Sequence, residues 1–361
     1  MEIPKPDLEH LHWAAWARLP GVGPRRVERL LACFGSLEAA WRAPAERLAA
    51  CRAWPTGALA GVLAARAGLD PAAALRHDMA RGYRVLARPT PGYPAALLDL
   101  ADPPPVLWLR GDLALPERAV AVVGARAASP YGLRQARRLG TELAEAGVLV
   151  VSGAAAGVDR AAHEGALAAG PTLAVLGCGG EHVYPAHHVG LYRAIAARGA
   201  LLSELPPEAR PRPGHFPRRN RLIAALGRAT VVVEARARSG SLITAGLAAE
   251  LGREVLAVPG PVGEPGSEGP HGLLRDGAGL VEGAADVFAA CGWPAPGRPA
   301  PAPAHPPEAQ ALLAALGAEA LAFDTLAART GLGPATLAAR LTALELAGAV
   351  RALPGGIYAR G

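Results

Sequence analysis

The sequence predicts an α/β protein with a parallel β-sheet in its central part. Between residues 118 and 290, short β-branched segments alternate with amphipathic helical stretches. This alternation is typical of a parallel sheet with helices on both faces. Residues 10–76 carry Ala and Leu at helical spacing, and a proline-rich segment precedes the last part of the chain. We therefore expect a helical N-terminal domain, an α/β core and a small C-terminal domain.

The strands of the core are expected where β-branched residues cluster. The candidates are Ala119–Val123, Val148–Val151, Thr172–Leu176, Ala200–Ser203, Ala229–Glu234 and Glu254–Val258. In such sheets ligands bind at the carboxyl ends of the strands. Glycine and serine gather at those ends, although tight turns between strands and helices also favour glycine. Candidate binding residues there are Gly124, Arg126 and Gly153.

The domain boundaries follow from changes in composition. Seven of the fourteen residues in 294–307 are proline, which is typical of a semi-rigid spacer. We expect a helical domain over 1–80, the α/β domain over 81–292, a linker over 293–307 and a last domain over 308–361. In the first domain, Leu19–Pro24 forms a Gly-x-Gly turn before an amphipathic helix, as in helix-hairpin-helix motifs.

The C-terminal domain has the element order of a winged helix. Helices are expected near Glu308–Leu316 and Phe323–Arg329 and over Pro334–Ala347, followed by two short strands around Pro354-Gly355. Its charged residues cancel, and phosphate neutralisation dominates DNA affinity. A contact with protein is therefore at least as well supported for this domain as a contact with DNA.

The strongest local signal is the basic stretch Pro207–Gly240. It holds eight arginines and two glutamates, so its net charge of eight minus two equals the +6 of the whole chain. Within it stand Phe216, Arg218, Arg219, Asn220 and Arg221. Arginine binds phosphate in a bidentate manner, and a phenylalanine ring stacks on an unpaired base. A solvated charged surface is the alternative interpretation.

Two further features of this stretch allow more than one interpretation. Asn220 is suited to bind a base edge or to cap the helix that begins there. Ser239-Gly240-Ser241 precedes a helix whose N-terminus could hold an anion, and simple N-capping by either serine explains the same pattern.

Several classes of protein are not supported. The sequence contains no P-loop, no dinucleotide-binding fingerprint and no nucleophile elbow. Its four dispersed cysteines fit a reducing compartment better than a disulfide framework or a zinc site. We expect a cytoplasmic protein with no membrane segment, no metal, no cofactor and no catalytic residue.

The central part resembles the DNA-processing protein A (DprA, or Smf) family of bacterial single-strand DNA-binding recombination mediators. The segments that carry the likeness include VVGARAASPYG (122–132), VSGAAAGVDRAAHEGAL (151–167) and FPRRNRLIAALGRATVVVEARARSGSLITA (216–245). Gly124 and Arg126 match the family's Gly-Ser-Arg element. The Phe-x-x-Arg-Asn-Arg element is matched by Phe216, Arg219, Asn220 and Arg221. Ala156 departs from the family, which often has a basic residue there.

The resemblance implies an extended Rossmann-like fold that dimerises through that fold. It also implies that single-stranded DNA lies in a basic pocket and that RecA is loaded onto this DNA during natural transformation. On this basis we expect Arg126, Arg219 and Arg221 to hold phosphates while Phe216 supports a base. The main alternative is a Rossmann-like enzyme that hydrolyses nucleoside monophosphates, although the Pro-Gly-Gly-x-Gly-Thr loop of such enzymes is lacking here. Glu204 and Glu234 near two strand ends are a candidate carboxylate pair, but nothing in the sequence sets them opposite a substrate. A regulator that binds duplex DNA through the winged helix is a second alternative.

Overall fold

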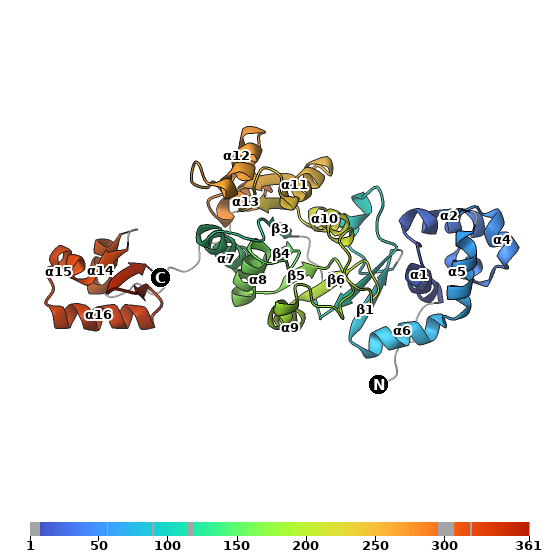
Figure 1. Cartoon of the computed structure of the whole chain (residues 1–361), viewed down its shortest axis with the longest axis horizontal. Coiled ribbons are helices and arrows are strands. Elements are labelled where there is room, and N and C mark those ends of the chain that lie inside the picture. The colour runs from blue at the N-terminus through green and yellow to red at the C-terminus, as the bar shows by residue number, and fades with distance from the viewer. Residues whose placement is uncertain are drawn as a thin grey trace. The chain divides into compact units, whose positions relative to one another are not determined.

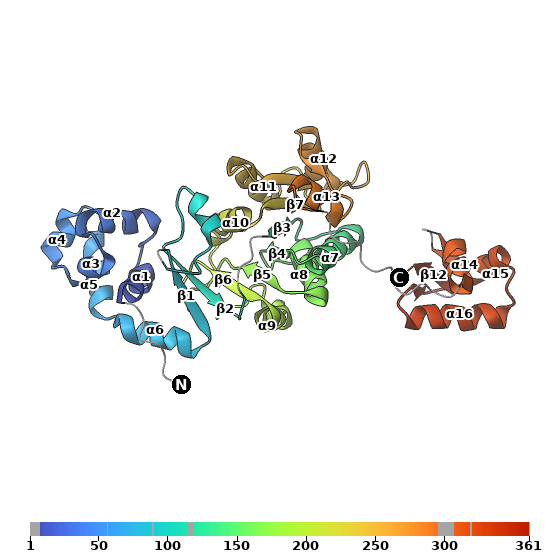
Figure 2. The same cartoon turned by 180° about the vertical axis from the view of Figure 1, so that it is seen from behind.

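The computed structural model describes residues 8–55, 57–88, 90–113, 118–294, 307–317 and 320–360. The chain divides into two compact units, Met1–Pro296 and Gly297–Gly361. The larger unit joins a helical N-terminal part to a sheet with helices on both faces, and the smaller unit contains helices and a small sheet (Figures 1 and 2). Most of the expected proline-rich linker, residues 295–306, lies outside the described residues.

The N-terminal part is helical, as the spacing of Ala and Leu predicts. Its core centres on the fully buried Trp16, whose ring meets Trp41 edge-on at 5.2 Å between centroids. The expected Gly-x-Gly turn is present, because the first helix ends at Arg18 and the second begins at Pro24. The helices are α1 (Leu8–Arg18), α2 (Pro24–Phe34), α3 (Leu37–Arg42), α4 (Ala45–Ala50), α5 (Ala58–Ala67) and α6 (Pro71–Ala80).

The hydropathy of the helices bears on membrane insertion. Among the described residues no single helix is both long enough and apolar enough to cross a bilayer. Helices α5 and α6 meet the criteria of length and composition only as a pair, and the two are bent by 69° relative to each other.

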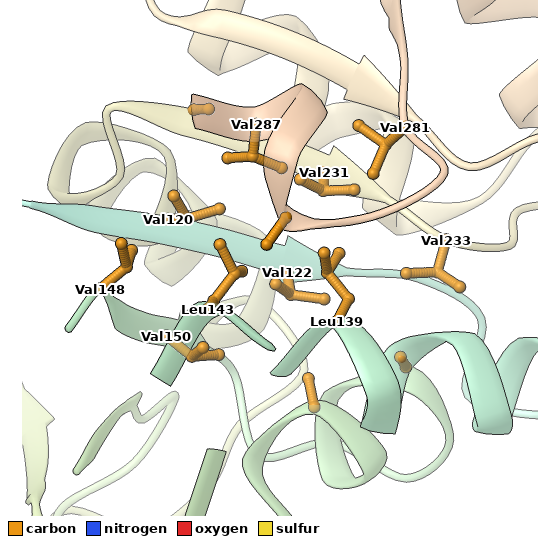
Figure 3. Close-up of a cluster of buried hydrophobic side chains, with 14 of the residues drawn as sticks. Val120, Val122, Leu139, Leu143, Val148, Val150, Val231, Val233, Val281 and Val287 are labelled. Carbon is orange, nitrogen blue, oxygen red and sulfur yellow. The ribbon is translucent and has the colours of Figure 1, made fainter. Parts of the chain in front are cut away.

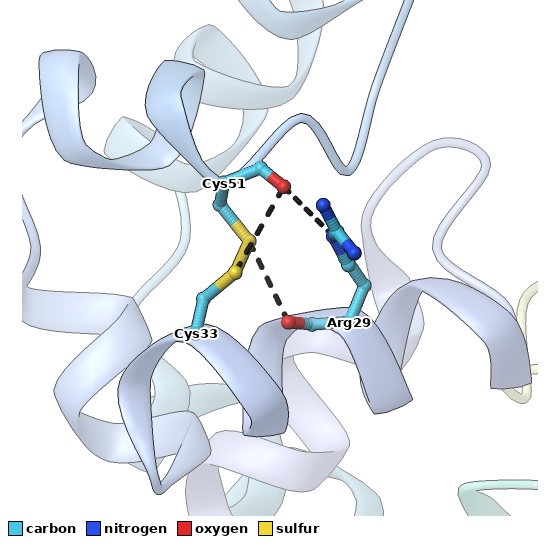
Figure 4. Close-up of a disulfide and its surroundings, with 3 residues drawn as sticks. All are labelled: Arg29, Cys33 and Cys51. Atoms are coloured by element: carbon cyan, nitrogen blue, oxygen red, sulfur yellow. Dashed lines mark hydrogen bonds between the residues drawn. A yellow bond between two sulfur atoms is a disulfide. The ribbon is translucent and has the colours of Figure 1, made fainter.

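A disulfide corrects the expectation that the cysteines are unpaired. Cys33 in α2 and Cys51 after α4 are bonded, with 6.0 Å between their Cα atoms (Figure 4). Arg29 lies beside the pair, and its Nε donates to the carbonyl oxygen of Cys51 at 2.9 Å. The two cysteines are 18 residues apart in sequence, and the packing of α2 against the end of α4 brings them together. Cys178 and Cys291 are buried free thiols.

The sheet of the larger unit is mostly parallel, with two antiparallel strands at one edge. Its order in the described residues is β1-β2-β6-β5-β4-β3-β7-β8-β9. All six expected strands are present, with ends that differ by up to two residues, and β1, β2 and β9 are additional. The strands are β1 (Tyr83–Ala87), β2 (Val106–Arg110), β3 (Ala119–Val123), β4 (Leu149–Ser152), β5 (Thr172–Val175), β6 (Ala200–Ser203), β7 (Ala229–Val232), β8 (Glu254–Ala257) and β9 (Gly279–Leu280).

The strand order creates a crevice beside β3. From β3 the chain builds outward through β4 and β5 to β6, and it then returns to add β7 on the other side of β3. The connections that leave β3 and β7 therefore diverge, which opens a crevice at the carboxyl ends of these strands. The expected Rossmann-like fold class is confirmed.

Helices cover both faces of this sheet, and successive residues of β3 alternate between the two cores. Val120 and Val122 face the core under α7, α8 and α13 (Figure 3), whereas Ala121 and Val123 face the core under α10 and α11. The helices are α7 (Pro130–Glu145), α8 (Val158–Ala169), α9 (Val189–Arg198), α10 (His215–Leu226), α11 (Gly240–Glu250), α12 (Glu268–Arg275) and α13 (Ala284–Ala290).

The smaller unit is the expected winged helix. Leucines such as Leu326, Leu337 and Leu341 are buried between its helices. The left-handed Gly331 ends the second helix, and Gly355 and Gly356 form the turn between the last strands. The elements are α14 (Pro307–Leu316), β10 (Leu321–Ala322), α15 (Phe323–Thr330), α16 (Pro334–Leu346), β11 (Val350–Leu353) and β12 (Ile357–Arg360).

A buried ion pair fixes the N-terminal helices to the edge of the sheet. Arg18 of α1 pairs with Asp78 of α6, and both side chains are buried. The carboxylate of Asp78 also accepts from Trp108 Nε1 of β2 at 2.9 Å, and the Arg18 guanidinium lies over the Trp108 ring. Arg18 reaches further to Glu208, at 2.6 Å, on the segment that leads to α10. These contacts join α1, α6, β2 and that segment.

We expect the two partners of Arg18 to differ sharply in their contribution to stability. Replacement of one member of a buried pair leaves a buried charge unpaired, which costs about 3–5 kcal/mol. Asp78→Ala should therefore lower the free energy of unfolding by this amount. Glu208→Gln is the matched control, because that carboxylate is largely exposed and such pairs contribute about 0–1 kcal/mol. Urea denaturation measures both, and equal effects would contradict the role of Asp78.

Candidate nucleic-acid interface

A cavity of about 740 Å³ opens at the carboxyl ends of the central strands. Its walls come from the loop after β3, the segment before α10, the exposed side of α10 and the N-terminus of α11. This is the crevice that the reversal of strand order between β3 and β7 creates. The lining includes eight of the residues expected from the sequence: Gly124, Arg126, Phe216, Arg219, Asn220, Ser239, Gly240 and Ser241.

An aromatic pair lies on one side of this cavity. Phe216 packs closely on Gly177, where an ideal Cβ would lie 2.6 Å from the ring. The centroids of the Tyr184 and Phe216 rings lie 4.9 Å apart, and the two ring planes are tilted by 38°. Tyr184 is 44% exposed. The guanidinium of Arg126 stands 6.0 Å from the centre of the Phe216 ring. One cation and two aromatic rings therefore share the same wall.

The positive charge of the cavity is exposed. Arg126, Arg212, Arg236 and Arg238 all line it with exposed side chains. Within the described part of the chain, no hydrogen bond holds any of these four guanidinium groups. With the buried Arg219 and Asp159, the lining carries five positive charges and one negative charge. Such a wall attracts a polyanion.

Arg219 differs from the expectation that it holds a phosphate. It is 5% exposed, and its Nη1 donates to the carbonyl oxygens of Gly153, at 2.9 Å, and of Val175. Its Nε donates to Asn220 Oδ1 at 3.2 Å. Burial lowers the pKa of Arg219, and the nearby charge of Asp159 raises it. These hydrogen bonds hold α10 against the ends of β4 and β5, and Arg219 forms part of the inner lining of the cavity.

Gly153 lies beneath Arg219 and outside the cavity lining. An ideal Cβ at this position would lie 2.6 Å from Arg219 Nη2 and 2.8 Å from Asp159 Oδ2, so only glycine fits between the two charges. Asp159 Oδ2 accepts from the backbone amides of Gly153 and Ala155. Burial raises the pKa of Asp159, and Arg219 and these amides oppose that effect. Gly153 therefore packs between two buried charges and does not line the cavity.

Arg221 also differs from the expectation. It is buried and lies outside the cavity lining, where its Nη2 pairs with Glu204 Oε2 at 2.5 Å. Arg218, which is half exposed, reaches the same oxygen at 3.3 Å. Burial raises the pKa of Glu204, and the two arginines lower it. Arg221 is an internal counter-charge, whereas Arg218 remains accessible at the edge of α10.

The remaining expected residues join α10 to α11. Asn220 Nδ2 donates to the carbonyl oxygen of Gly240 at 3.5 Å. Ser239 is the N-cap of α11, and its Oγ accepts from the backbone amide of Ser241. The capping interpretation therefore holds for Ser239, and both serines also line the cavity.

Sequence reasoning missed the contributions of Tyr184 and Asp159. Tyr184 follows β5 in a segment without a regular pattern, so nothing local placed it beside Phe216. Asp159 opens α8 and its side chain turns inward to the charge of Arg219, a partner sixty residues away in sequence. Metal-binding groups of three or more His, Cys, Asp or Glu side chains are absent from the described ranges.

The model of a protein family matches most of the α/β part of the chain. The family is described as DNA recombination-mediator protein A, and the match covers residues 84–292. The chain belongs to this family. A second model, the DprA winged helix domain, matches residues 296–356. The resemblance seen in the motifs is thereby confirmed, and the chain is a member of a family of DNA-processing recombination mediators.

Individual DprA and Smf proteins are similar over much of their length. The Smf protein of Escherichia coli is 42% identical over 73% of this chain and 74% of its own. A putative DprA of Mycobacterium tuberculosis is 40% identical over 93% of this chain and 90% of its own.

Solved DprA structures have the same fold. The structure from Streptococcus pneumoniae superposes with a TM-score of 0.67 at 32% identity, over 80% of this chain and 98% of its own. The structure from Helicobacter pylori has a TM-score of 0.53 at 32% identity, over 57% of this chain and 94% of its own, and it was solved to study how that protein binds single-stranded DNA.

We expect Arg219 and Arg126 to respond differently to replacement by alanine. Arg219→Ala removes the counter-charge of the buried Asp159 and should lower the free energy of unfolding by about 3–5 kcal/mol. Arg126→Ala removes an exposed side chain and should stay within about 0.5 kcal/mol of the native value. Chemical denaturation distinguishes the two, and a stable Arg219→Ala protein would contradict the structural role.

Proposed function

We propose that this chain binds single-stranded DNA in the cavity at the ends of β3 and β7. The observation that carries the proposal is the wall on which Phe216 and Tyr184 lie beside Arg126. Aromatic rings stack on unpaired bases, and arginines neutralise the phosphates between them. The DprA of Helicobacter pylori, a relative with this fold, binds single-stranded DNA, and this supports the same ligand here.

The form of the wall favours a single strand over a duplex. In a duplex the faces of the bases are covered by their neighbours, so an aromatic ring in a crevice has no base face to contact. Phe216 lies inside the cavity and not on a protruding helix or ribbon that could enter a groove. The four exposed arginines supply the attraction that does not depend on sequence.

The geometry gives no support to the alternative of nucleotide hydrolysis. Both candidate carboxylates have other roles in the fold. Glu204 is paired with Arg221 and Arg218. Glu234 accepts from the amide and the hydroxyl of Ser129 at 2.8 and 2.5 Å and so caps α7. Neither group is free to activate a water molecule above the cavity.

Membership of the family supports two further proposals. The first is that the protein delivers the bound strand to RecA, and the second is that it forms a homodimer through the Rossmann-like part. A RecA strand-exchange assay on DNA covered by single-strand binding protein tests the delivery. Analytical ultracentrifugation of the full chain tests the dimer.

We expect oligothymidylate to bind at least tenfold more tightly than a duplex of the same length. Phe216→Ala should weaken the single-strand complex by about 1–3 kcal/mol, which is the contribution of one stacked base. Arg126→Ala should weaken it as well and lower the slope of log affinity against log salt by about 0.7.

Arg228 provides the matched control for this experiment. It belongs to the same basic stretch and is exposed, but it does not line the cavity. Arg228→Ala should therefore bind nearly as the native protein does. Fluorescence anisotropy at several salt concentrations measures all of these effects. Equal affinity for single and double strands would overturn the proposal.

A further inference from the structure

A second cavity lies next to the first and has no role in the function proposed so far. It has a volume of about 360 Å³ and is lined by residues of the loop after β3 and of helices α7 and α8. Arg126 and Ala127 line both cavities. The second cavity therefore begins where the first one ends, at the same exposed arginine.

Glycines place the charged side chains of α7 and α8 together. An ideal Cβ at Gly165 of α8 would lie 2.0 Å from the carbonyl oxygen of Arg137, and one at Gly140 of α7 would lie 2.4 Å from that of Ala162. The two backbones are thus in direct contact, and α7 and α8 lie side by side in both views (Figures 1 and 2). Arg137 of α7 consequently faces Glu164 of α8, and Glu164 lies one helical turn after Arg160.

One carboxylate is shared by two arginines in this cavity. Arg160 Nε lies 2.6 Å from Glu164 Oε1, and Arg137 Nη2 pairs with the other oxygen, Oε2. Burial alone would raise the pKa of Glu164, but the hydrogen bonds from Arg160 and Arg137 outweigh it and hold the pKa below its ordinary value. Glu164 is therefore ionised at neutral pH.

The arginines retain unused binding capacity. Each guanidinium has five N–H donors, and Glu164 occupies a small part of them. The side chains of Arg137 and Arg160 are about half exposed, 54% and 52%. With Arg126, the cavity has three positive charges and one negative charge, a net charge of +2. A pair of arginine forks around an oxyanion is the arrangement that also binds a phosphodiester.

We propose that the second cavity is a phosphate site for the DNA strand that leaves the first cavity. The strand would pass Arg126 and run along the facing sides of α7 and α8, where Arg137 and Arg160 hold one further phosphate beside Glu164. The inference rests on the proposed function, and it adds a path that the bound strand follows beyond the first cavity. The ligand is the sugar–phosphate backbone, because Leu133 and small residues provide no surface for stacking a base.

The test compares oligothymidylates of two lengths, about 4 and about 16 nucleotides, which span the range that single-strand sites cover. The short strand fills the first cavity, and the long strand reaches the second. The double variant Arg137→Gln/Arg160→Gln should bind the short strand as the native protein does. Its affinity for the long strand should fall about tenfold, and its salt slope should fall by about 0.7.

Two controls separate this site from a general effect of charge. Arg138 is the next residue on α7 and pairs with Glu142, outside the cavity. Arg138→Gln removes one positive charge from the same helix and should bind the long strand as the native protein does. Glu164→Gln removes the negative charge from the cavity and should bind the long strand about threefold more tightly, a change that partial unfolding would not produce.

The outcomes distinguish this inference from the function on which it rests. A native protein that binds neither strand overturns both. A native protein that binds both strands, with a double variant that matches it on the long strand, overturns the second cavity alone. Equal losses on short and long strands, or a loss with Arg138→Gln as large as with the double variant, also overturn it.

Discussion

The buried guanidinium of Arg219 is the constraint on which the rest of the site depends. A charge inside a protein is costly unless it is paired and hydrogen-bonded. The partners of Arg219 are carbonyl oxygens at the ends of β4 and β5, and the carboxylate of Asp159 lies nearby. Because these groups are fixed by the strand ends and by α8, α10 has one orientation in which its charge is compensated. Phe216 lies one helical turn before Arg219, so the same orientation directs its ring into the cavity.

The arginines of this region fall into two groups, one buried in the fold and one exposed in the cavity. Arg219 and Arg221 hold α10 through internal partners, while Arg126, Arg212, Arg236 and Arg238 are left to meet a ligand. Arg219 and Arg221 fix the orientation of α10 in the folded protein. A ligand that binds in the cavity therefore does not have to order this helix, which lowers the entropic cost of binding. The basic stretch therefore contributes to folding and, in the function proposed here, also to recognition.

The fold was readable from the sequence where the signal is local. The β-branched strands from Ala119 onward alternate with helices, and their parallel pairing follows from that alternation. β1 and β2 were not expected. β1 pairs only with β2, and β2 pairs with β6, which is far away in sequence; both pairings are antiparallel. The disulfide between Cys33 and Cys51 was missed for the same reason, since spacing alone does not bring two cysteines together.

The candidate site was predictable as a region but not residue by residue. Charge and the aromatic at Phe216 identified the stretch that lines the cavity. Which arginines turn inward depends on Glu204, Gly153 and Val175, and these partners come from strand ends that the local pattern does not connect with α10. Burial of a charge is a tertiary property, and so the division between structural and exposed arginines required the fold.

Photochemical cross-linking tests the central claim, that a single strand lies against the aromatic wall at the strand ends. Oligonucleotides with 5-iodouracil in place of thymine form bonds to aromatic side chains within contact distance. Irradiation of the full-length complex, followed by peptide mass spectrometry, should place the cross-link on Phe216 or Tyr184. Cross-links confined to the winged helix, residues 307–360, would contradict the account.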